Sequence, residues 1–244
     1  MEVVAQFMGA RGEIEIIRSR LDGTLAYYED GIFQSQGTPA GESVFTYVKL
    51  MTELLHNSSR VLVLGCGAGN LATELSRRGK LVTLVDVNPL SFIVARRYFG
   101  LPGELRCVTA DFRKVVADEE EVYDGIAIDV AAPGLSIKRT FSAEVCDCLR
   151  SRLAPGGRIV MNLTIDNDLD PMPDRLAAML SGNILHPWIV DEPGVEGRNA
   201  VLNCSPERLA SRRSAFVKLL SSNGEKWLVR KGRLGGVDRV RWPS

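Results

Sequence analysis

Three alternate glycines follow a short apolar run in the first half of the chain. The run Val61–Leu64 leads into Gly65, Gly67 and Gly69, with Cys66 between the first two, and a helix-like segment follows. Glycine lets the backbone turn sharply there and lets a ligand approach N–H groups that a β-carbon would block. A phosphate or nucleoside ligand suits such a loop.

Two acidic residues end later apolar runs in the same way. Asp86 closes Leu81–Asp86, seventeen residues beyond Gly69, and Asp129 closes Tyr123–Asp129. Asp86 can accept hydrogen bonds from both hydroxyls of a ribose. The alternative is that the glycines form only a tight turn and Asp86 only caps the helix after it. The spacing G-x-G-x-G, in place of G-x-G-x-x-G, makes a dinucleotide less suitable than a mononucleoside. Asp129 can hold an ammonium and take its proton, or it can cap the turn after it.

The elements that must position these residues alternate between apolar runs and amphipathic segments. This pattern is typical of strands buried on both faces and joined by crossover helices. We therefore expect an α/β, Rossmann-like, doubly wound fold with a mostly parallel seven-stranded sheet. The candidate strands are 61–64, 81–86, 105–109, 123–129, 158–163, 184–190, 200–203 and 227–230, and the candidate helices are 43–56, 70–78, 89–99, 138–153, 173–181 and 206–221.

A different pattern precedes these elements. Between Glu13 and Gln34, β-branched and aromatic residues surround Asp22-Gly23 and Asp30-Gly31, dipeptides that favour tight turns with positive φ. We expect a small β-meander that packs on the main domain or pairs with a second copy. The expected organisation is 1–42 for this segment, 43–232 for the ligand-binding domain and 233–244 for a tail.

Composition narrows the classes of partner. Thirty basic residues balance thirty acidic ones, which argues against nucleic acid and against an anionic membrane surface. The start of the chain has no secretory pattern, so we expect a cytoplasmic protein. The five cysteines are scattered, and the C-x-C pair Cys146 and Cys148 has no partner pair nearby, so we expect no metal site.

The motifs, taken in order, resemble those of class I S-adenosylmethionine-dependent enzymes. They are the first-motif sequence VLVLGCGAG, Asp86 and the segment Thr109–Phe112. The resemblance implies that Asp86 and the adjacent Val87 bind the ribose side of the nucleoside. It also implies that Asp111 and Phe112 contact adenine, although Asp111 alone could equally cap a helix.

Within that class the chain resembles the spermidine synthase family from about Leu21 to Asn203. The resemblance is carried by Asp22-Gly23, Gln34-Ser35, Phe45-x-Tyr47, ARRYF at 95–99, YDGIAID at 123–129 and LAPGG at 153–157. It implies S-adenosylmethionine or its decarboxylated form as co-substrate, with Gln34 lining the nucleoside pocket. It further implies that Asp129 binds and deprotonates the attacking amine, that Tyr47 supports it, and that the protein is a homodimer.

The acceptor half departs from the family pattern. Typical members place His or Gln and then Glu after the tyrosine, and a second Asp three residues beyond the catalytic one. Here Val48 and Lys49 follow Tyr47, and Ala132 takes the place of the second Asp. We therefore expect an aminopropyl or other alkyl transferase acting on an amine other than putrescine, unless Glu29, Asp30 or Glu42 supplies the missing charge. Methyl transfer and an inactive nucleoside-binding module remain the alternatives.

Overall fold

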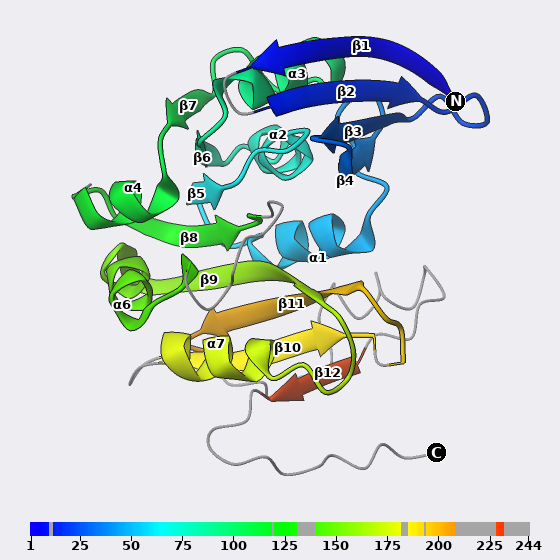
Figure 1. Ribbon diagram of the computed structural model, residues 1–244. Coiled ribbons are helices and arrows are strands. Elements are labelled where there is room, and N and C mark those ends of the chain that lie inside the picture. The colour runs from blue at the N-terminus through cyan, green and yellow to red at the C-terminus, as the bar shows by residue number, and fades with distance from the viewer. Residues whose placement is uncertain are drawn as a thin grey trace.

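The computed structural model describes residues 1–9, 12–118, 120–130, 140–181, 185–192 and 194–207, and the backbone of 228–231. The described chain forms two sheets (Figure 1). A four-stranded antiparallel sheet at the N-terminus has the order β1-β2-β3-β4. Its strands are β1 (Glu2–Gly9), β2 (Gly12–Arg18), β3 (Leu25–Glu29) and β4 (Ile32–Gly37).

The larger sheet has the strand order β12-β10-β11-β9-β8-β5-β6-β7. Its strands are β5 (Arg60–Leu64), β6 (Leu81–Asp86), β7 (Arg106–Thr109), β8 (Tyr123–Ile128), β9 (Leu153–Ile165), β10 (His186–Asp191), β11 (Arg198–Ser205) and β12 (Leu228–Lys231). Strands β5 to β9 pair in parallel, and β11 is antiparallel to both β9 and β10. All eight candidate strands are present in this sheet; the last of them, 227–230, corresponds to β12, which lies at the edge beside the seven other strands.

Helices cover both faces of this sheet, which confirms the doubly wound fold. One layer contains α1 (Thr46–Leu54), α2 (Asn70–Arg77) and α3 (Pro89–Tyr98); the other contains α4 (Phe112–Asp118), α6 (Ala143–Ser151) and α7 (Met172–Ser181). Successive side chains of β5 alternate between the two cores: Val61 and Val63 pack with α1 and α2, while Leu62 and Leu64 pack with α4 and α6. The strands therefore read as continuous apolar runs.

Several element boundaries differ from the sequence prediction. Helix α6 begins at Ala143, because Ser142 is extended and its hydroxyl caps the Val145 N–H at 3.4 Å. Helix α4 was not among the candidate helices, although the capping alternative for Asp111 allowed for it, and β9 begins at Leu153, before the predicted start. The predicted helix 206–221 lies mostly outside the described residues, as do residues 138 and 139.

The N-terminal sheet packs on the main domain, which was one of the two arrangements expected for it. Ile14, Ile16 and Tyr27 form a core with Val94 and Phe99 of the α3 region. The predicted turn at Asp30-Gly31 joins β3 to β4 with φ values of 50° and 73°. Strand β1 was missed because none of its residues is fully buried and its sequence gives little apolar alternation. Pairing with a second copy stays a prediction.

No helix in the described part of the chain combines the length and apolar character needed to cross a membrane.

Candidate active site

A cleft of about 760 Å³ lies where the parallel strands of the large sheet reach their carboxyl ends. Residues from β3, β4 and the turn between them complete its lining. Ten predicted site residues line this cleft: Gln34, Tyr47, Gly65, Cys66, Gly67, Asp86, Val87, Asp111, Phe112 and Asp129. Segments far apart in sequence thus meet at one place, as expected for ligand sites in open α/β sheets.

The glycine loop lines the cleft and also contacts Asp129, the candidate catalytic residue. Gly65 has a φ of 97°, and a β-carbon there would overlap the carbonyl oxygen of Asp129. The Asp129 N–H donates to the Leu64 carbonyl oxygen at 2.8 Å, so the two strand ends are tied together. Gly65 is therefore required by the neighbouring strand, independently of any ligand.

Gly69 was predicted to bind the nucleoside, but it does not line the cleft. It has a φ of 73°, forms the N-cap of α2 and donates its N–H to the Cys66 carbonyl oxygen at 2.7 Å. A β-carbon there would press against Ala95 and Leu101. Its role in the structure is the turn into α2 and close packing against α3.

Asp86 organises the loops on either side of it. Its Oδ2 accepts the Cys66 N–H at 2.7 Å, and its Oδ1 accepts the Asn88 N–H at 2.8 Å. Bonds of this kind, from backbone N–H to carboxylate, are stronger than neutral ones. The carboxylate also lines the cleft beside Val87, where the sequence predicts the ribose. Asp86 is therefore a structural anchor of the loop as well as a candidate ligand residue.

Asp111 carries out the capping role that the sequence left open. Its Oδ1 accepts the Arg113 N–H at 2.9 Å near the start of α4. The Arg113 guanidinium also donates to both carboxylate oxygens, and these bonds are the main reason why the pKa of Asp111 is lowered. Phe112 lines the cleft and packs against Phe141 with ring centroids 5.5 Å apart. Contact of Asp111 and Phe112 with adenine stays a prediction.

Asp129 is the candidate catalytic residue, and it lies at the end of the cleft away from Asp86. Its Oδ2 accepts the Tyr47 hydroxyl at 3.4 Å, and its Oδ1 accepts the Asn162 side-chain N–H at 2.9 Å. Burial raises the pKa of Asp129, while these two hydrogen bonds act in the opposite direction. Burial and the neighbouring carboxylate raise the pKa of Tyr47 well above its usual value, so this hydroxyl stays protonated as a donor. An oriented carboxylate with a raised pKa is suited to accept a proton.

Asn162 was missed by sequence reasoning. It interrupts the apolar run of β9 close to the carboxyl end of that strand, as Asp86 and Asp129 do at the ends of theirs. A polar residue at that position was the available signal. Because a carboxylate only accepts, the bond to Asp129 fixes which end of the Asn162 amide faces it.

Aromatic side chains form a continuous row beside Asp129, also unexpected from the sequence. Ring centroids are 5.3 Å apart for Tyr28 and Phe33, 5.7 Å for Phe33 and Phe45, and 5.7 Å for Phe45 and Tyr47. Three of these residues, Phe33, Phe45 and Tyr47, line the cleft. We call these three the aromatic row. They give the Asp129 end of the cleft an apolar wall.

The expected departures at the acceptor end have different structural outcomes. Val48 is buried in the core and Lys49 is exposed, so neither lines the cleft; successive helix residues point in different directions. Lys49 was placed in the acceptor half by its position after Tyr47, but it adds no positive charge to the cleft lining. Ala132 lies outside the described residues. Of the acids considered as replacements, Glu29 and Asp30 line the cleft and Glu42 does not.

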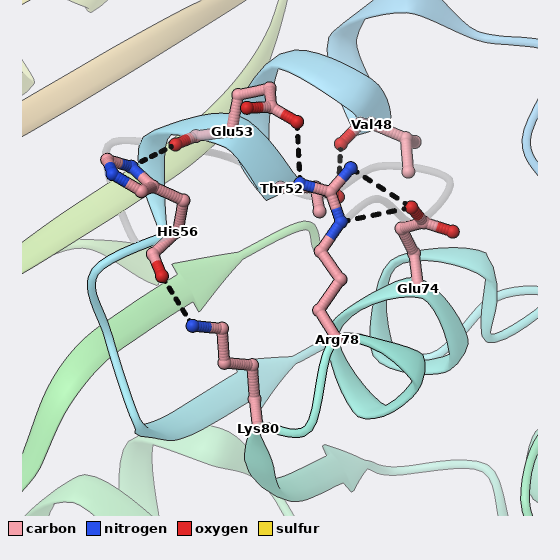
Figure 2. A network of polar contacts seen from close by, with 7 residues as sticks. All are labelled: Val48, Thr52, Glu53, His56, Glu74, Arg78 and Lys80. Atoms are coloured by element: carbon pink, nitrogen blue, oxygen red, sulfur yellow. Dashed lines mark hydrogen bonds and ion pairs between the residues drawn. The ribbon is translucent and has the colours of Figure 1, made fainter. Parts of the chain in front are cut away.

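A polar network holds the helix that carries Tyr47 against the helix that follows the glycine loop (Figure 2). Arg78 beyond α2 pairs with Glu53 of α1 at 2.5 Å and with Glu74 of α2 at 3.1 Å. Lys80 donates to the His56 carbonyl oxygen, which ties the end of α1 to the start of β6. These contacts join α1, which carries Tyr47, to the end of α2 and to the segment before β6 at the surface.

Within the described residues there is no group of three or more His, Cys, Asp or Glu side chains arranged to hold a metal ion.

Comparison with known proteins agrees with this geometry. A protein-family model described as a methyltransferase domain matches residues 61–157. A probable polyamine aminopropyl transferase of Bifidobacterium longum is 29% identical over 140 residues, covering 54% of this chain and 31% of that protein. An N-terminal histidine N-methyltransferase of Emericella nidulans is 30% identical over 116 residues, covering 46% of this chain and 21% of that protein. The matches thus span less than a third of the length of either relative.

Solved structures give the same result for the fold. A probable spermidine synthase from Corynebacterium glutamicum superposes with a TM-score of 0.81 and 19% identity, covering 100% of both chains. A spermidine synthase in complex with the transition-state analogue AdoDATO gives 0.67 and 18%, covering 84% of this chain and 74% of that one.

The chain therefore has the class I methyltransferase-like fold. Its predicted resemblance to the spermidine synthase family is confirmed, in sequence by the Bifidobacterium relative and in fold by the two spermidine synthase structures.

Proposed function

We propose that this protein is a transferase that moves an aminopropyl group from the sulfonium of decarboxylated S-adenosylmethionine to an amine. The observation that carries the proposal is Asp129, held by Tyr47 and Asn162 at one end of the cleft whose floor is the glycine loop. The carboxylate binds the ammonium by charge and accepts its proton. The nitrogen then bonds to the carbon beside sulfur, the carbon–sulfur bond breaks, and its electron pair goes to sulfur, which leaves a neutral thioether nucleoside.

The charge of the cleft supports a donor without a carboxylate. Its described lining contains five acids, namely Glu29, Asp30, Asp86, Asp111 and Asp129. Arg113 is the basic side chain in the same described lining, and Asp111 already holds its guanidinium. A buried carboxylate without a partner is costly. Decarboxylated S-adenosylmethionine brings a sulfonium and an ammonium to this cleft and no carboxylate.

The acceptor end supports an amine with one charged group and an apolar body. Asp129 can pair with the attacking nitrogen, and the aromatic row extends from Tyr47 beside it to Phe33, which is 43% exposed. A hydrocarbon tail buried against these rings gains about 25 cal/mol per Å² of apolar area. The proposed acceptor is therefore a primary monoamine with an alkyl or aryl tail, in preference to putrescine.

Calorimetry with the two donors tests the first part. We expect decarboxylated S-adenosylmethionine to bind at least about tenfold more tightly than S-adenosylmethionine, since one unpaired carboxylate costs more than about 1.4 kcal/mol. Equal or tighter binding of S-adenosylmethionine would contradict the donor assignment and favour methyl transfer.

Steady-state kinetics with hexylamine and putrescine tests the acceptor. Phe33→Ala should raise the KM for hexylamine about tenfold, with little change in kcat, because the ring contacts the tail and not the reacting atoms. The matched control is Ile32→Ala, since Ile32 is equally exposed at 43% and does not line the cleft. Efficient turnover of putrescine, or equal effects of both substitutions, would refute the acceptor assignment.

Methyl transfer is the second candidate function, favoured by the methyltransferase-domain match over residues 61–157 and by the Emericella relative. It uses the same in-line geometry at the sulfonium carbon. The intact arrangement of Tyr47, Asp129 and Asn162 counts against a protein that only binds the nucleoside.

A further inference from the structure

Glu29 lies at the Asp86 end of the cleft. A carboxylate that replaces the missing acid of the acceptor site would have to lie at the other end, near Asp129. It ends β3, an interior strand of the N-terminal sheet, and its half-buried side chain lines the cleft. Its charge acts on Asp86, Asp30, Tyr27 and Cys66, whereas the groups acting on Asp129 are Tyr47 and Asn162. The N-terminal sheet thus brings a second carboxylate to the Asp86 end.

A buried asparagine fixes Glu29 beside Asp86. The Asn88 side-chain N–H donates to Glu29 Oε1 at 2.6 Å, while the Asn88 backbone N–H donates to Asp86 Oδ1 at 2.8 Å. The Asn88 Oδ1 caps α3 by accepting the Leu90 N–H at 3.2 Å, which fixes the amide orientation. Asn88 is 3% exposed, so this bridge is held rigidly by the core.

Two carboxylates held in one corner of a cleft determine what can bind there. Burial, and to a smaller extent the charges of Asp86 and Asp30, raise the pKa of Glu29. Such a corner repels anions and accepts hydrogen bonds, so its ligand must offer donors. A vicinal diol offers two O–H donors with the separation of neighbouring carbons. A phosphate on either oxygen would meet two negative charges.

We infer that Glu29 is a second ribose-binding carboxylate, which acts with Asp86 to select an unsubstituted 2′,3′-diol. The inference rests on the proposed function because it requires a nucleoside in this cleft. It adds a second residue of the N-terminal sheet, beside the predicted Gln34, to the nucleoside site: Asp86 on the main sheet accepts one hydroxyl, and Glu29 on β3 accepts the other. It also gives a physical reason to reject nucleotides that carry a 2′-phosphate.

Calorimetry with methylthioadenosine and its 2′-deoxy and 3′-deoxy analogues tests this inference. Glu29→Gln keeps an oxygen for the Asn88 bond and removes the charge, so the fold should be retained. We expect this variant to bind methylthioadenosine about tenfold more weakly, the effect of losing one hydrogen bond to a charged group. For one of the two deoxy analogues, the affinity of Glu29→Gln should be less than about twofold below that of wild type, since this analogue lacks the hydroxyl that Glu29 binds. The matched control is Glu42→Gln, because Glu42 is an exposed acid outside the cleft lining. This substitution should leave the affinity for all three ligands unchanged.

The wild-type protein supplies an arm that does not depend on the variant folding. It should bind each deoxy analogue at least about tenfold more weakly than methylthioadenosine, because each removes a donor to one carboxylate. Equal weakening of all three ligands in Glu29→Gln, or wild-type binding that ignores one hydroxyl, would overturn the role of Glu29 and leave the proposed function intact. Failure of the wild-type protein to bind methylthioadenosine would instead overturn the proposed function.

Discussion

Removing the carboxylate of Asp86 should weaken both the fold and the nucleoside site. The side chain accepts two backbone N–H groups, from Cys66 at 2.7 Å and from Asn88 at 2.8 Å. A hydrogen bond to a charged group contributes about 1.5–3 kcal/mol, so the pair sets an upper range of about 3–6 kcal/mol. Water from the cleft can reach both N–H groups in the variant and replace part of this. We therefore expect Asp86→Ala to lower the free energy of unfolding by about 3 kcal/mol.

Urea unfolding with and without methylthioadenosine measures both effects. A ligand at a hundred times its Kd stabilises the native state by about 2.7 kcal/mol, and this gain should nearly vanish in Asp86→Ala at the same concentration. Asp124→Ala is the matched control, because Asp124 accepts the N–H groups of Ser59 and Arg60 at 2.8–2.9 Å but does not line the cleft. The control should lose stability and keep the ligand effect. Unchanged stability in Asp86→Ala, or an equal ligand effect in both variants, would refute this reasoning.

Three further predictions concern the surroundings of the cleft. Because burial raises the pKa of Asp129, the native state binds more protons than the unfolded chain between the two pKa values, and stability falls as pH rises through that window. Asp129→Asn should therefore unfold at a higher temperature than wild type at pH 7, with the difference shrinking towards pH 4 in calorimetric scans. Gly65→Ala should cost at least about 2 kcal/mol by urea unfolding, because φ is 97° and the new β-carbon overlaps Asp129; Gly79→Ala, with φ of 77° and open space, should cost about 1 kcal/mol. Arg78→Met should cost only about 1 kcal/mol in the same assay, an effect reduced further by salt, because the arginine side chain is 36% exposed and solvent screens its pairs.

The sequence predicts the parallel core well because burial on both faces leaves a direct record in composition. Val61–Leu64 is apolar throughout, and Leu81–Asp86 is apolar except for Thr83 and the terminal Asp86; the observed limits of both strands differ from the prediction by at most one residue. The Asp30-Gly31 turn is equally readable, since positive φ restricts the residues that can occupy it. These signals are local, so each can be read without knowing the rest of the fold.

The rest of the site depends on contacts between distant segments. No local signal indicates that Glu29 reaches Asn88, because the contact requires the N-terminal sheet to dock on α3. Asp111 caps α4 through a local bond from the Arg113 N–H, but its place in the cleft lining depends on how segments far apart in the sequence meet. Lys49 was placed at the acceptor end from its position after Tyr47, although the helix turns it towards solvent.

The identity of the nucleoside product tests the central claim most directly. The protein is incubated with hexylamine and either decarboxylated S-adenosylmethionine or S-adenosylmethionine. The nucleoside products are then separated by chromatography and identified by mass spectrometry. Aminopropyl transfer predicts amine-dependent release of methylthioadenosine from the first donor, reduced at least about a hundredfold in Asp129→Asn because the proton acceptor is lost. Amine-dependent release of S-adenosylhomocysteine from the second donor, without methylthioadenosine from the first, would contradict the account in favour of methyl transfer.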